Sequence, residues 1–316
     1  MKPFIPYSLL AAFAACGLAS AQTATTTPVG YYSFDGKAGG NLFVPGLVNS
    51  PLFAGSITAA TDNDPAADTL TVATGVLTAG AFDAGAVYPT HYVEITQAGS
   101  NQGVVIDIES NTDSVITLVA DISALALTGT ETIVVRPHVT LAEVFADAED
   151  ELAAFGDSAT FFEATGEATS YFYTESGVWT TDFENPDGSA RPIPPGSGFV
   201  LDLGSDKGLV IAGEVKSSAT VVQFNAGTVN ILGPVNPLVG DSEQLANLGF
   251  VNIEPFADSM TLFTPGNLVT PIGSFFSDGT NMTEDFENPS SVEIPFTTGG
   301  VFQAGTAGSI RIQSGL

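Results

Sequence analysis

One five-residue string occurs twice in this chain. Asp-Phe-Glu-Asn-Pro stands at 182–186 and again at 285–289. The match extends upstream, because residues 157–161 resemble residues 258–262 at an offset of 101 residues. Similar segments that recur at a nearly constant offset indicate a duplicated folding unit, and such a repeat constrains the architecture more than any single motif does.

The offset between the two copies changes further upstream. Residues 141–144 match 245–248 at an offset of 104, whereas residues 33–35 match 223–225 at an offset of 190. The first copy therefore carries about 86 residues that the second lacks. We expect three parts in the folded chain: a discontinuous β unit at 24–52 plus 138–212, an inserted β-domain at 53–137 and a second β unit at 213–316.

The local pattern predicts strands. Short runs such as 69–72, 91–95 and 114–119 alternate apolar and polar residues, are rich in β-branched side chains and end at turn residues. One exception is Thr140 with Glu143, which has the spacing of a capping box and predicts a helix over 141–154. The fold class is therefore all-β with one or two short helices, as tandem β-sandwich-like units with a small β-barrel or sandwich inserted in the first.

The first 21 residues are typical of a signal peptide. A positive Lys2 precedes an apolar run at 5–18, and the small residues at 19–21 form a cleavage site before Gln22. The apolar run is too short for a transmembrane anchor, so we expect none in the mature chain. A lipoprotein box ending at Cys16 is a poorer match than ordinary cleavage. We therefore expect a secreted, extracellular or periplasmic protein, and its folded part contains no cysteine.

The charge balance restricts the partners. After the signal segment the chain has 35 acidic and six basic residues, a formal charge of −29. Such a surface repels nucleic acid and anionic lipid headgroups, so neither is expected as a partner. An extracellular protein or a glycan remains compatible with this charge.

The sequence also resembles an uncharacterised family of secreted proteins from verrucomicrobial-type bacteria. The resemblance implies export and a duplicated β architecture, and it implies no catalytic residue. The segments that carry the resemblance are 29–35, 41–52, 92–95, 135–141, 171–173 with Trp179, and 193–199.

No nucleophilic site emerges from the sequence. Gly156-Asp157-Ser158 resembles the nucleophile block of a GDS-type esterase, a chemistry that needs a histidine base late in the chain. The two histidines, His91 and His138, both precede Ser158 and lack the spacing of a zinc site. We interpret Asp157-Ser158 as a turn that opens a strand.

Calcium is the one cofactor that the sequence suggests. Asp62 and Asp64 with Asp68, and separately Asp182, Glu184 and Asp187, group carboxylates in segments typical of turns, as a hard cation requires. Neither group has the spacing of a dedicated calcium loop. The alternative interpretation is that the acids build turns while the phenylalanine of each repeated string anchors it in a core.

Aromatic residues of the first unit are the candidates for ligand binding. If exposed, Tyr171, Tyr173 and Trp179 could stack on a sugar or contact a partner protein; the alternative is that they fill a β core. The function expected from the sequence is an exported, non-catalytic structural or binding protein for adhesion or assembly. The alternative function is a secreted carbohydrate-active hydrolase with paired carboxylates, although no pair stands out.

Overall fold

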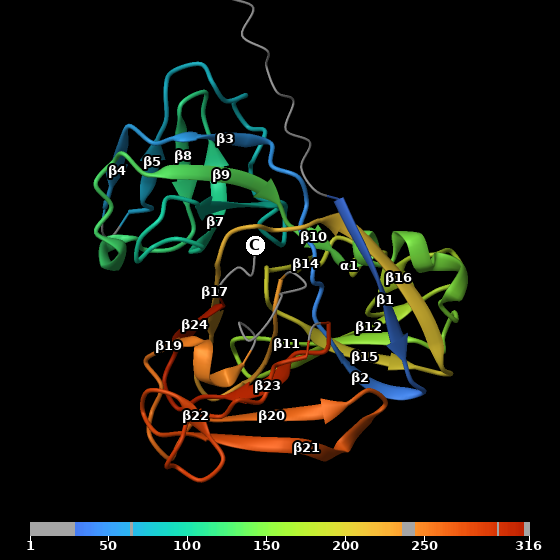
Figure 1. Ribbon diagram of the computed structural model, residues 1–316. Helices are drawn as coiled ribbons and strands as arrows, with labels where there is room; N and C mark the ends of the chain where they lie inside the picture. Colours follow the sequence, from blue (N-terminus) through green and yellow to red (C-terminus); the bar gives the residue numbers. More distant parts are fainter. Residues whose placement is uncertain (1–28, 64–65, 236–243, 296, 313–316) are drawn as a thin grey trace, which may run out of the picture.

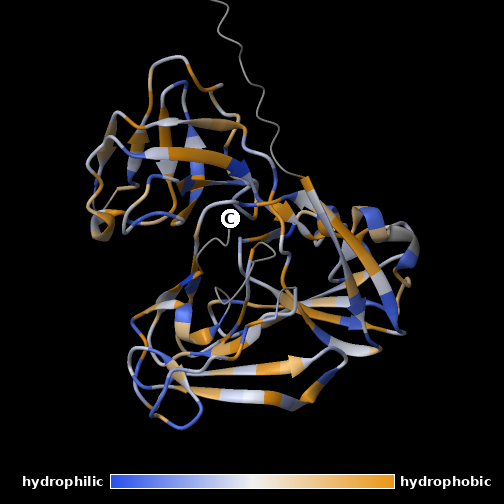
Figure 2. Cartoon of the chain, in the orientation of Figure 1, coloured by the Kyte–Doolittle hydropathy of each residue, from blue (hydrophilic) through white to orange (hydrophobic). Residues whose placement is uncertain are grey.

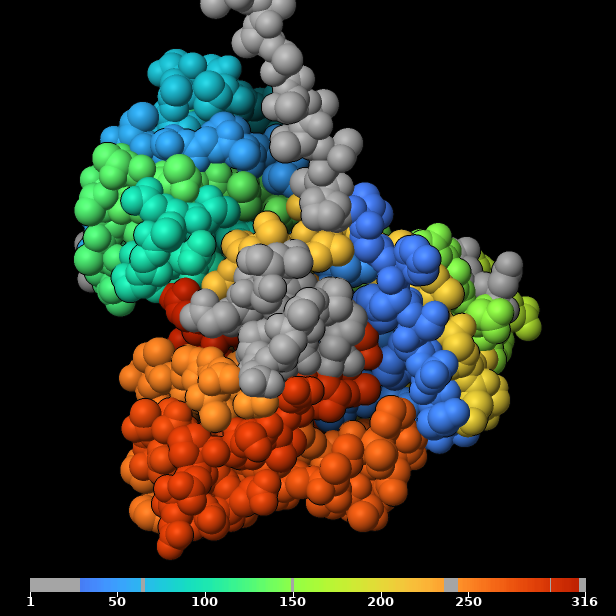
Figure 3. Space-filling model, in the orientation of Figure 1, coloured from blue at the N-terminus to red at the C-terminus, as the bar shows by residue number. Residues whose placement is uncertain are grey.

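The computed structural model describes residues 29–63, 66–235, 244–295 and 297–312. The predicted signal peptide lies outside these residues. Below, the first unit is 29–52 with 138–212, the barrel is 53–137, and the second unit is 213–312. Figures 1 and 3 show them as three lobes. The all-β fold class is confirmed, since strands make up nearly all of the regular structure.

The barrel is a single antiparallel sheet of seven strands in the order β3-β9-β6-β7-β8-β5-β4. Its edge strands β3 and β4 are separated only by Ile57 and Thr58, so the sheet has to curl until its edges nearly meet. The bend itself is held by Ile57 N–H donating to Glu131 O and Thr58 N–H donating to Thr71 O. The strands are β3 (Phe53–Ser56), β4 (Ala59–Thr61), β5 (Thr69–Thr71), β6 (His91–Ile95), β7 (Val105–Asn111), β8 (Val115–Leu118) and β9 (Thr132–Pro137), with a short 3-10 helix at Ser123–Leu125.

The first unit contains a five-stranded sheet in the order β13-β12-β11-β15-β2, which faces the long antiparallel pair β1–β16 across a common core. A two-residue pair, β10 with β14, closes one end. The strands are β1 (Val29–Gly36), β2 (Gly39–Phe43), β10 (Val139–Thr140), β11 (Ser158–Phe162), β12 (Ala168–Tyr173), β13 (Trp179–Thr180), β14 (Pro192–Ile193), β15 (Phe199–Leu203) and β16 (Lys207–Glu214).

The second unit has a five-stranded sheet in the order β22-β21-β20-β23-β18 and a three-stranded sheet in the order β17-β24-β19. In chain order, the strands of this five-stranded sheet take the same places as those of the first unit. The strands are β17 (Thr220–Phe224), β18 (Val229–Leu232), β19 (Gly249–Val251), β20 (Ser259–Thr264), β21 (Asn267–Ser277), β22 (Met282–Thr283), β23 (Gly300–Gln303) and β24 (Gly308–Ile312), with a 3-10 helix at Leu245–Asn247.

Equivalent polar side chains brace both units. Buried Asn41 donates from Nδ2 to the carbonyls of Lys37, Gly39 and Leu201. Buried Asn230 does the same toward the carbonyls of Asn225, Thr228 and Phe302. In each unit one amide thus satisfies three backbone acceptors where the second strand starts.

The two units contact each other reciprocally. Val44 N–H of the first unit donates to Thr297 O of the second at 2.7 Å, and Gly233 N–H of the second donates to Gly196 O of the first at 3.0 Å. Gly196 and Thr297 both have left-handed backbone, at φ 79° and 74°. Apolar side chains from both sheets, centred on Leu42, Val44 and Ile231, fill the contact. This packing makes one body of the two units.

Buried ion pairs join the barrel to the units. Lys216 Nζ, in the connector after β16, lies 2.8 Å from Glu94 Oε1 of β6. Arg136 of β9 donates to Glu214 Oε1 at 2.7 Å and lies 3.6 Å from Glu94 Oε2. Two cations therefore balance two carboxylates in a buried cluster, which we call the junction cluster.

The helix predicted over 141–154 is shorter than expected. The capping box forms, with Glu143 N–H donating to Thr140 Oγ1 and Thr140 N–H donating to Glu143 Oε2, and α1 spans Leu141–Val144. Phe145 then leaves helical geometry at φ −106° and ψ 12°, and a 3-10 helix follows at Ala146–Glu151. The apolar residues of this segment reach the core in tighter 3-10 turns.

Hydrophobic residues concentrate along the strands of the three lobes (Figure 2). Each lobe has its own buried cluster: one around Phe145 and Phe199 in the first unit, one around Ile108 and Val135 in the barrel, and one around Phe275 and Phe302 in the second unit. Burial of these side chains is the main favourable term for folding.

Candidate functional site

The first repeated string folds into a tight turn at the surface, directly after β13. Thr180 Oγ1 accepts the N–H of Phe183 at 2.9 Å, and Asp182 Oδ1 accepts the N–H groups of Glu184 at 2.9 Å and Asn185 at 3.0 Å. These hydrogen bonds from Glu184 and Asn185 lower the pKa of Asp182 to about 2. The carboxylate is thus an acceptor for the turn and stays ionised.

The second string repeats these three hydrogen bonds. Thr283 Oγ1 accepts the N–H of Phe286 at 2.9 Å, and Asp285 Oδ1 accepts the N–H groups of Glu287 at 3.0 Å and Asn288 at 3.3 Å. The hydrogen bonds from Glu287 and Asn288 lower the pKa of Asp285 as well. The identical letters therefore encode an identical local structure, with a phenylalanine at its centre.

Both turns hold that phenylalanine in left-handed backbone. Phe183 has φ 64° and Phe286 has φ 61°. Just before β11 and before β20, Phe155 and Phe256 have the same geometry, at φ 61° and 63°. Seven described non-glycine residues have positive φ, and four of them are these phenylalanines. A bulky side chain in this region is an energetic outlier, and such outliers gather at functional sites.

In the first unit these rings form an exposed cluster. Phe183 stacks on Phe172 at a centroid distance of 5.1 Å and contacts Phe155 at 5.6 Å. Phe155 is 60% exposed and Phe183 is 52% exposed. We call these three residues the first phenylalanine cluster. The interpretation in which Phe183 anchors its string in a core is wrong, because the turn directs the ring along the protein surface.

The second unit carries an equivalent exposed cluster. Phe286 stacks on Phe276 at 5.8 Å and contacts Phe256 at 4.8 Å. Phe256 is 75% exposed and Phe286 is 42% exposed, so Phe286 does not anchor a core either. Phe276 lies opposite Ser259 in the β20–β21 pairing, just as Phe172 lies opposite Ser158 in the β11–β12 pairing. These three residues are the second phenylalanine cluster.

Each cluster lies at the end of its hairpin that is remote from the other unit. The opposite end of each hairpin makes the contact between units: Thr228 Oγ1 donates to Glu163 O beside the β11–β12 turn, and Gly266 in the β20–β21 turn packs against Lys37. The two clusters are therefore separate surfaces, and the unit contact leaves both of them open.

A groove of about 450 Å³ adjoins the first cluster. Phe155, Phe183 and Pro186 give it apolar walls, and Glu175 and Glu184 stand at its rim. Both carboxylates are exposed.

The acids of the first repeated string do not assemble as a metal site in the described part of the chain. Asp182 is occupied by the turn, and Asp187 accepts hydrogen bonds from Thr181 N at 3.0 Å and Thr181 Oγ1 at 2.6 Å. Glu184 instead lines the groove. The contacts of Asp182 and Asp187 therefore agree with the alternative interpretation, in which these acids build turns.

The structure does bring Asp62 close to other acids, although Asp64 lies outside the described residues. Ligand oxygens of Asp62, Asp68 and Asp121 all lie within 4.8 Å of one another. Buried Asp68 already accepts the N–H groups of Asn63 and Ile122, both at 2.8 Å. A hard cation would be held here by three carboxylates of different solvent exposure. Sequence reasoning missed Asp121, which only the folding of the barrel places beside Asp62.

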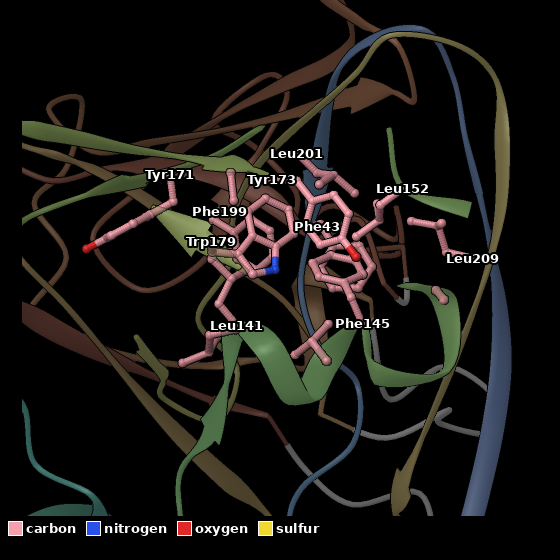
Figure 4. Packing of buried hydrophobic residues seen from close by; sticks show 14 of the residues in the cluster. Phe43, Leu141, Phe145, Leu152, Tyr171, Tyr173, Trp179, Phe199, Leu201 and Leu209 are labelled. Carbon is pink, nitrogen blue, oxygen red and sulfur yellow. The ribbon is translucent and has the colours of Figure 1, made fainter. Parts of the chain in front are cut away.

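The predicted ligand-binding aromatics lie in the core instead. Trp179 is 1% exposed, and Tyr171 and Tyr173 are also buried, packed with Phe145 and Phe199 (Figure 4). Tyr171 OH pairs with Tyr88 OH of the barrel at 3.0 Å, and burial raises the pKa of Tyr171. The structure therefore corrects the prediction that these rings stack on a ligand: in β12 they face inward, while Phe172 between them faces outward.

The residues of the esterase-like block are structural. Buried Asp157 accepts Ala153 N at 2.7 Å and Gly204 N at 2.9 Å. In the second unit Asp258 accepts Glu254 N and Gly305 N, both at 2.7 Å. In both units, the equivalent buried aspartate thus accepts two backbone amides and stabilises the turn before a strand.

The histidines lie at the junction of the barrel and the first unit: His91 belongs to β6, and His138 follows β9 directly. His138 Nε2 lies 2.9 Å from Asp107 Oδ1. His91 Nδ1 lies 2.7 Å from Thr90 Oγ1, and burial and the nearby His138 lower the pKa of His91.

No family model, curated protein or solved structure matches this chain. None of the helices in the described part is long and apolar enough to cross a membrane. The phenylalanine clusters are the candidate site on geometric grounds alone.

Proposed function

We propose that this chain is an exported, non-catalytic binding protein of the cell exterior, acting in adhesion or assembly, with the two phenylalanine clusters as its binding surfaces. The observation that carries the proposal is that both units hold three phenylalanines in the same exposed arrangement, two of them with left-handed backbone.

The fold itself does not require phenylalanine at these positions. The turn around Phe183 is built by Thr180 Oγ1, Asp182 Oδ1 and backbone amides, all of which an asparagine at 183 would keep. Asparagine and glycine also adopt left-handed backbone more readily than phenylalanine. Exposed rings in a strained backbone are therefore better explained by a partner that covers them.

The charged groups favour binding over hydrolysis. Among the described residues, buried carboxylates serve the structure: Asp157 and Asp258 accept backbone amides, and Glu94 and Glu214 pair with cations. The basic side chains are likewise engaged with carboxylates or backbone carbonyls: Lys37, Arg136, Arg191, Lys207, Lys216 and Arg311. The outer surface is thus dominated by acids, which disfavours polyanionic partners.

The test is co-sedimentation of the labelled protein with washed cells and extracellular material of the producing organism. The wild-type chain is expected to sediment, whereas the variant F155N/F183N/F256N/F286N stays in the supernatant. Circular dichroism and melting temperature check that the variant is folded. Equal sedimentation of variant and wild type would contradict the proposal.

A further inference from the structure

The groove beside the first phenylalanine cluster has the composition of a carbohydrate site. Its apolar surface comes from Phe155, Phe183 and Pro186, which are all exposed. Ligand sites combine such aromatic surface with a few polar groups that fix orientation. The rings offer flat faces for the C–H groups of a sugar, and they cannot hydrogen-bond to it themselves.

The rim supplies the polar groups that the rings lack. Glu175 and Glu184 line the groove, and within the described part neither carboxylate accepts a hydrogen bond from the protein. Asn185 donates from Nδ2 to Asp182 Oδ2 at 3.2 Å, which leaves its amide oxygen facing solvent. Carboxylates are strong acceptors for hydroxyl groups, so this rim suits a ligand that presents several hydroxyls.

The second unit keeps Glu287 and Asn288, the equivalents of Glu184 and Asn185, but it has no counterpart of Glu175. There the loop after Phe276 is a tight turn in which Asp278 Oδ1 accepts the N–H groups of Thr280 and Asn281, both at 2.7 Å. These hydrogen bonds from Asn281 and Thr280, only partly offset by burial, lower the pKa of Asp278. The acid of this loop, Asp278, is thus already an acceptor within its own turn, and Gly279 stands where the first unit has Glu175.

The negative charge of the protein favours neutral polysaccharides over acidic ones. A formal charge of −28 for the whole chain and two free carboxylates at the rim oppose sulfated or uronic acid chains. A neutral polysaccharide meets no such barrier. The groove is also partly open to solvent.

We infer that this groove binds a neutral polysaccharide, with one sugar ring against Phe155 and Phe183 and its hydroxyls on Glu175, Glu184 and Asn185. The inference rests on the proposed function and deepens it for the first unit. The second cluster would then contact the same extracellular material through its exposed rings, Phe256 and Phe286.

The experiment is isothermal titration of the purified chain with neutral hexasaccharides of β-glucan, xylan, mannan and chitin, and with oligogalacturonate as the acidic comparator. At least one neutral sugar is expected to bind. F183N is expected to weaken its affinity tenfold or more, E175Q several-fold, and F183Y by less than threefold because the ring is kept. Y31N, which removes a ring that is 83% exposed on β1 and belongs to neither cluster, is the control and is expected to leave the affinity unchanged.

The inference is overturned if no neutral hexasaccharide binds, if oligogalacturonate binds as tightly, or if Y31N weakens binding as much as F183N. Failure here remains distinct from failure of the proposed function. If the sugars do not bind but the four-asparagine variant still loses co-sedimentation, the clusters bind a protein instead of a glycan.

Discussion

Replacing Lys216 with methionine is expected to destabilise the whole protein, because it unbalances the junction cluster. The side chains of Lys216 and Glu94 are both fully buried, and Nζ lies 2.8 Å from Oε1. The ammonium also donates to Ser218 Oγ at 2.8 Å and to the carbonyl of Ala219. Methionine fills a similar volume but leaves one negative charge in excess among buried groups.

The magnitude follows from this geometry. Removing one partner of a buried ion pair typically costs about 3–5 kcal/mol, because the other charge stays desolvated. Arg136 Nε, at 3.6 Å from Glu94 Oε2, is too far to replace the lost contact. Adding E94Q to K216M removes the excess charge. The double variant is therefore expected to be about 1–3 kcal/mol more stable than the summed losses of the two single variants would give.

The assay is urea unfolding at pH 7, followed by circular dichroism for the strands and by the single tryptophan, Trp179, for the first unit. Lys37→Met, which breaks the exposed pair with Asp206, is the control and is expected to cost less than about 1 kcal/mol. A loss below about 1 kcal/mol for K216M, or no recovery in the double variant, would refute the reasoning.

Three further predictions concern single acids. Burial raises the pKa of Glu131, but hydrogen bonds from Thr128, Thr130 and its own amide outweigh burial and bring the pKa to about 2. The ionised Glu131 therefore stabilises the fold above about pH 4.5, and this contribution is lost as the pH falls toward 2. In acid unfolding curves, the difference in unfolding free energy between wild type and E131Q is expected to disappear over that range. D157A and D258A are each expected to cost about 2–4 kcal/mol, because each leaves two backbone amides without their acceptor; melting temperatures that stay unchanged would contradict this. In chelator, D121N is expected to lower the melting temperature, because Asp121 Oδ1 accepts the N–H of Ser123 at 2.7 Å and this hydrogen bond, which lowers the pKa of Asp121, favours the ionised carboxylate; a melting temperature that rises would contradict this.

The strand content could be predicted from the sequence because alternation and turn residues are local signals. The start of the helix was equally readable, since Thr140 and Glu143 form the capping box themselves. Its length was not, because the change to 3-10 geometry at Phe145 depends on how that ring meets Phe43 and Trp179 in the core.

The site was harder to predict because exposure is not a local property. Period-two spacing places Tyr171 and Tyr173 on one face of β12 and Phe172 on the other, but only the packed sheet decides which face is buried. The left-handed backbone of Phe183 and Phe286 contradicts the preference of phenylalanine, so propensity could not reveal it. The repeated string was the one signal that marked this position.

The most direct test of the central claim, that both phenylalanine clusters bind, is dissociation kinetics from immobilised extracellular material of the producing organism. Variants F155N/F183N and F256N/F286N each keep one cluster, and each is expected to dissociate about 10–100-fold faster than the wild-type chain because bivalent binding is lost. The variant that combines both changes is expected not to bind. Dissociation at the wild-type rate from either two-residue variant would contradict the account.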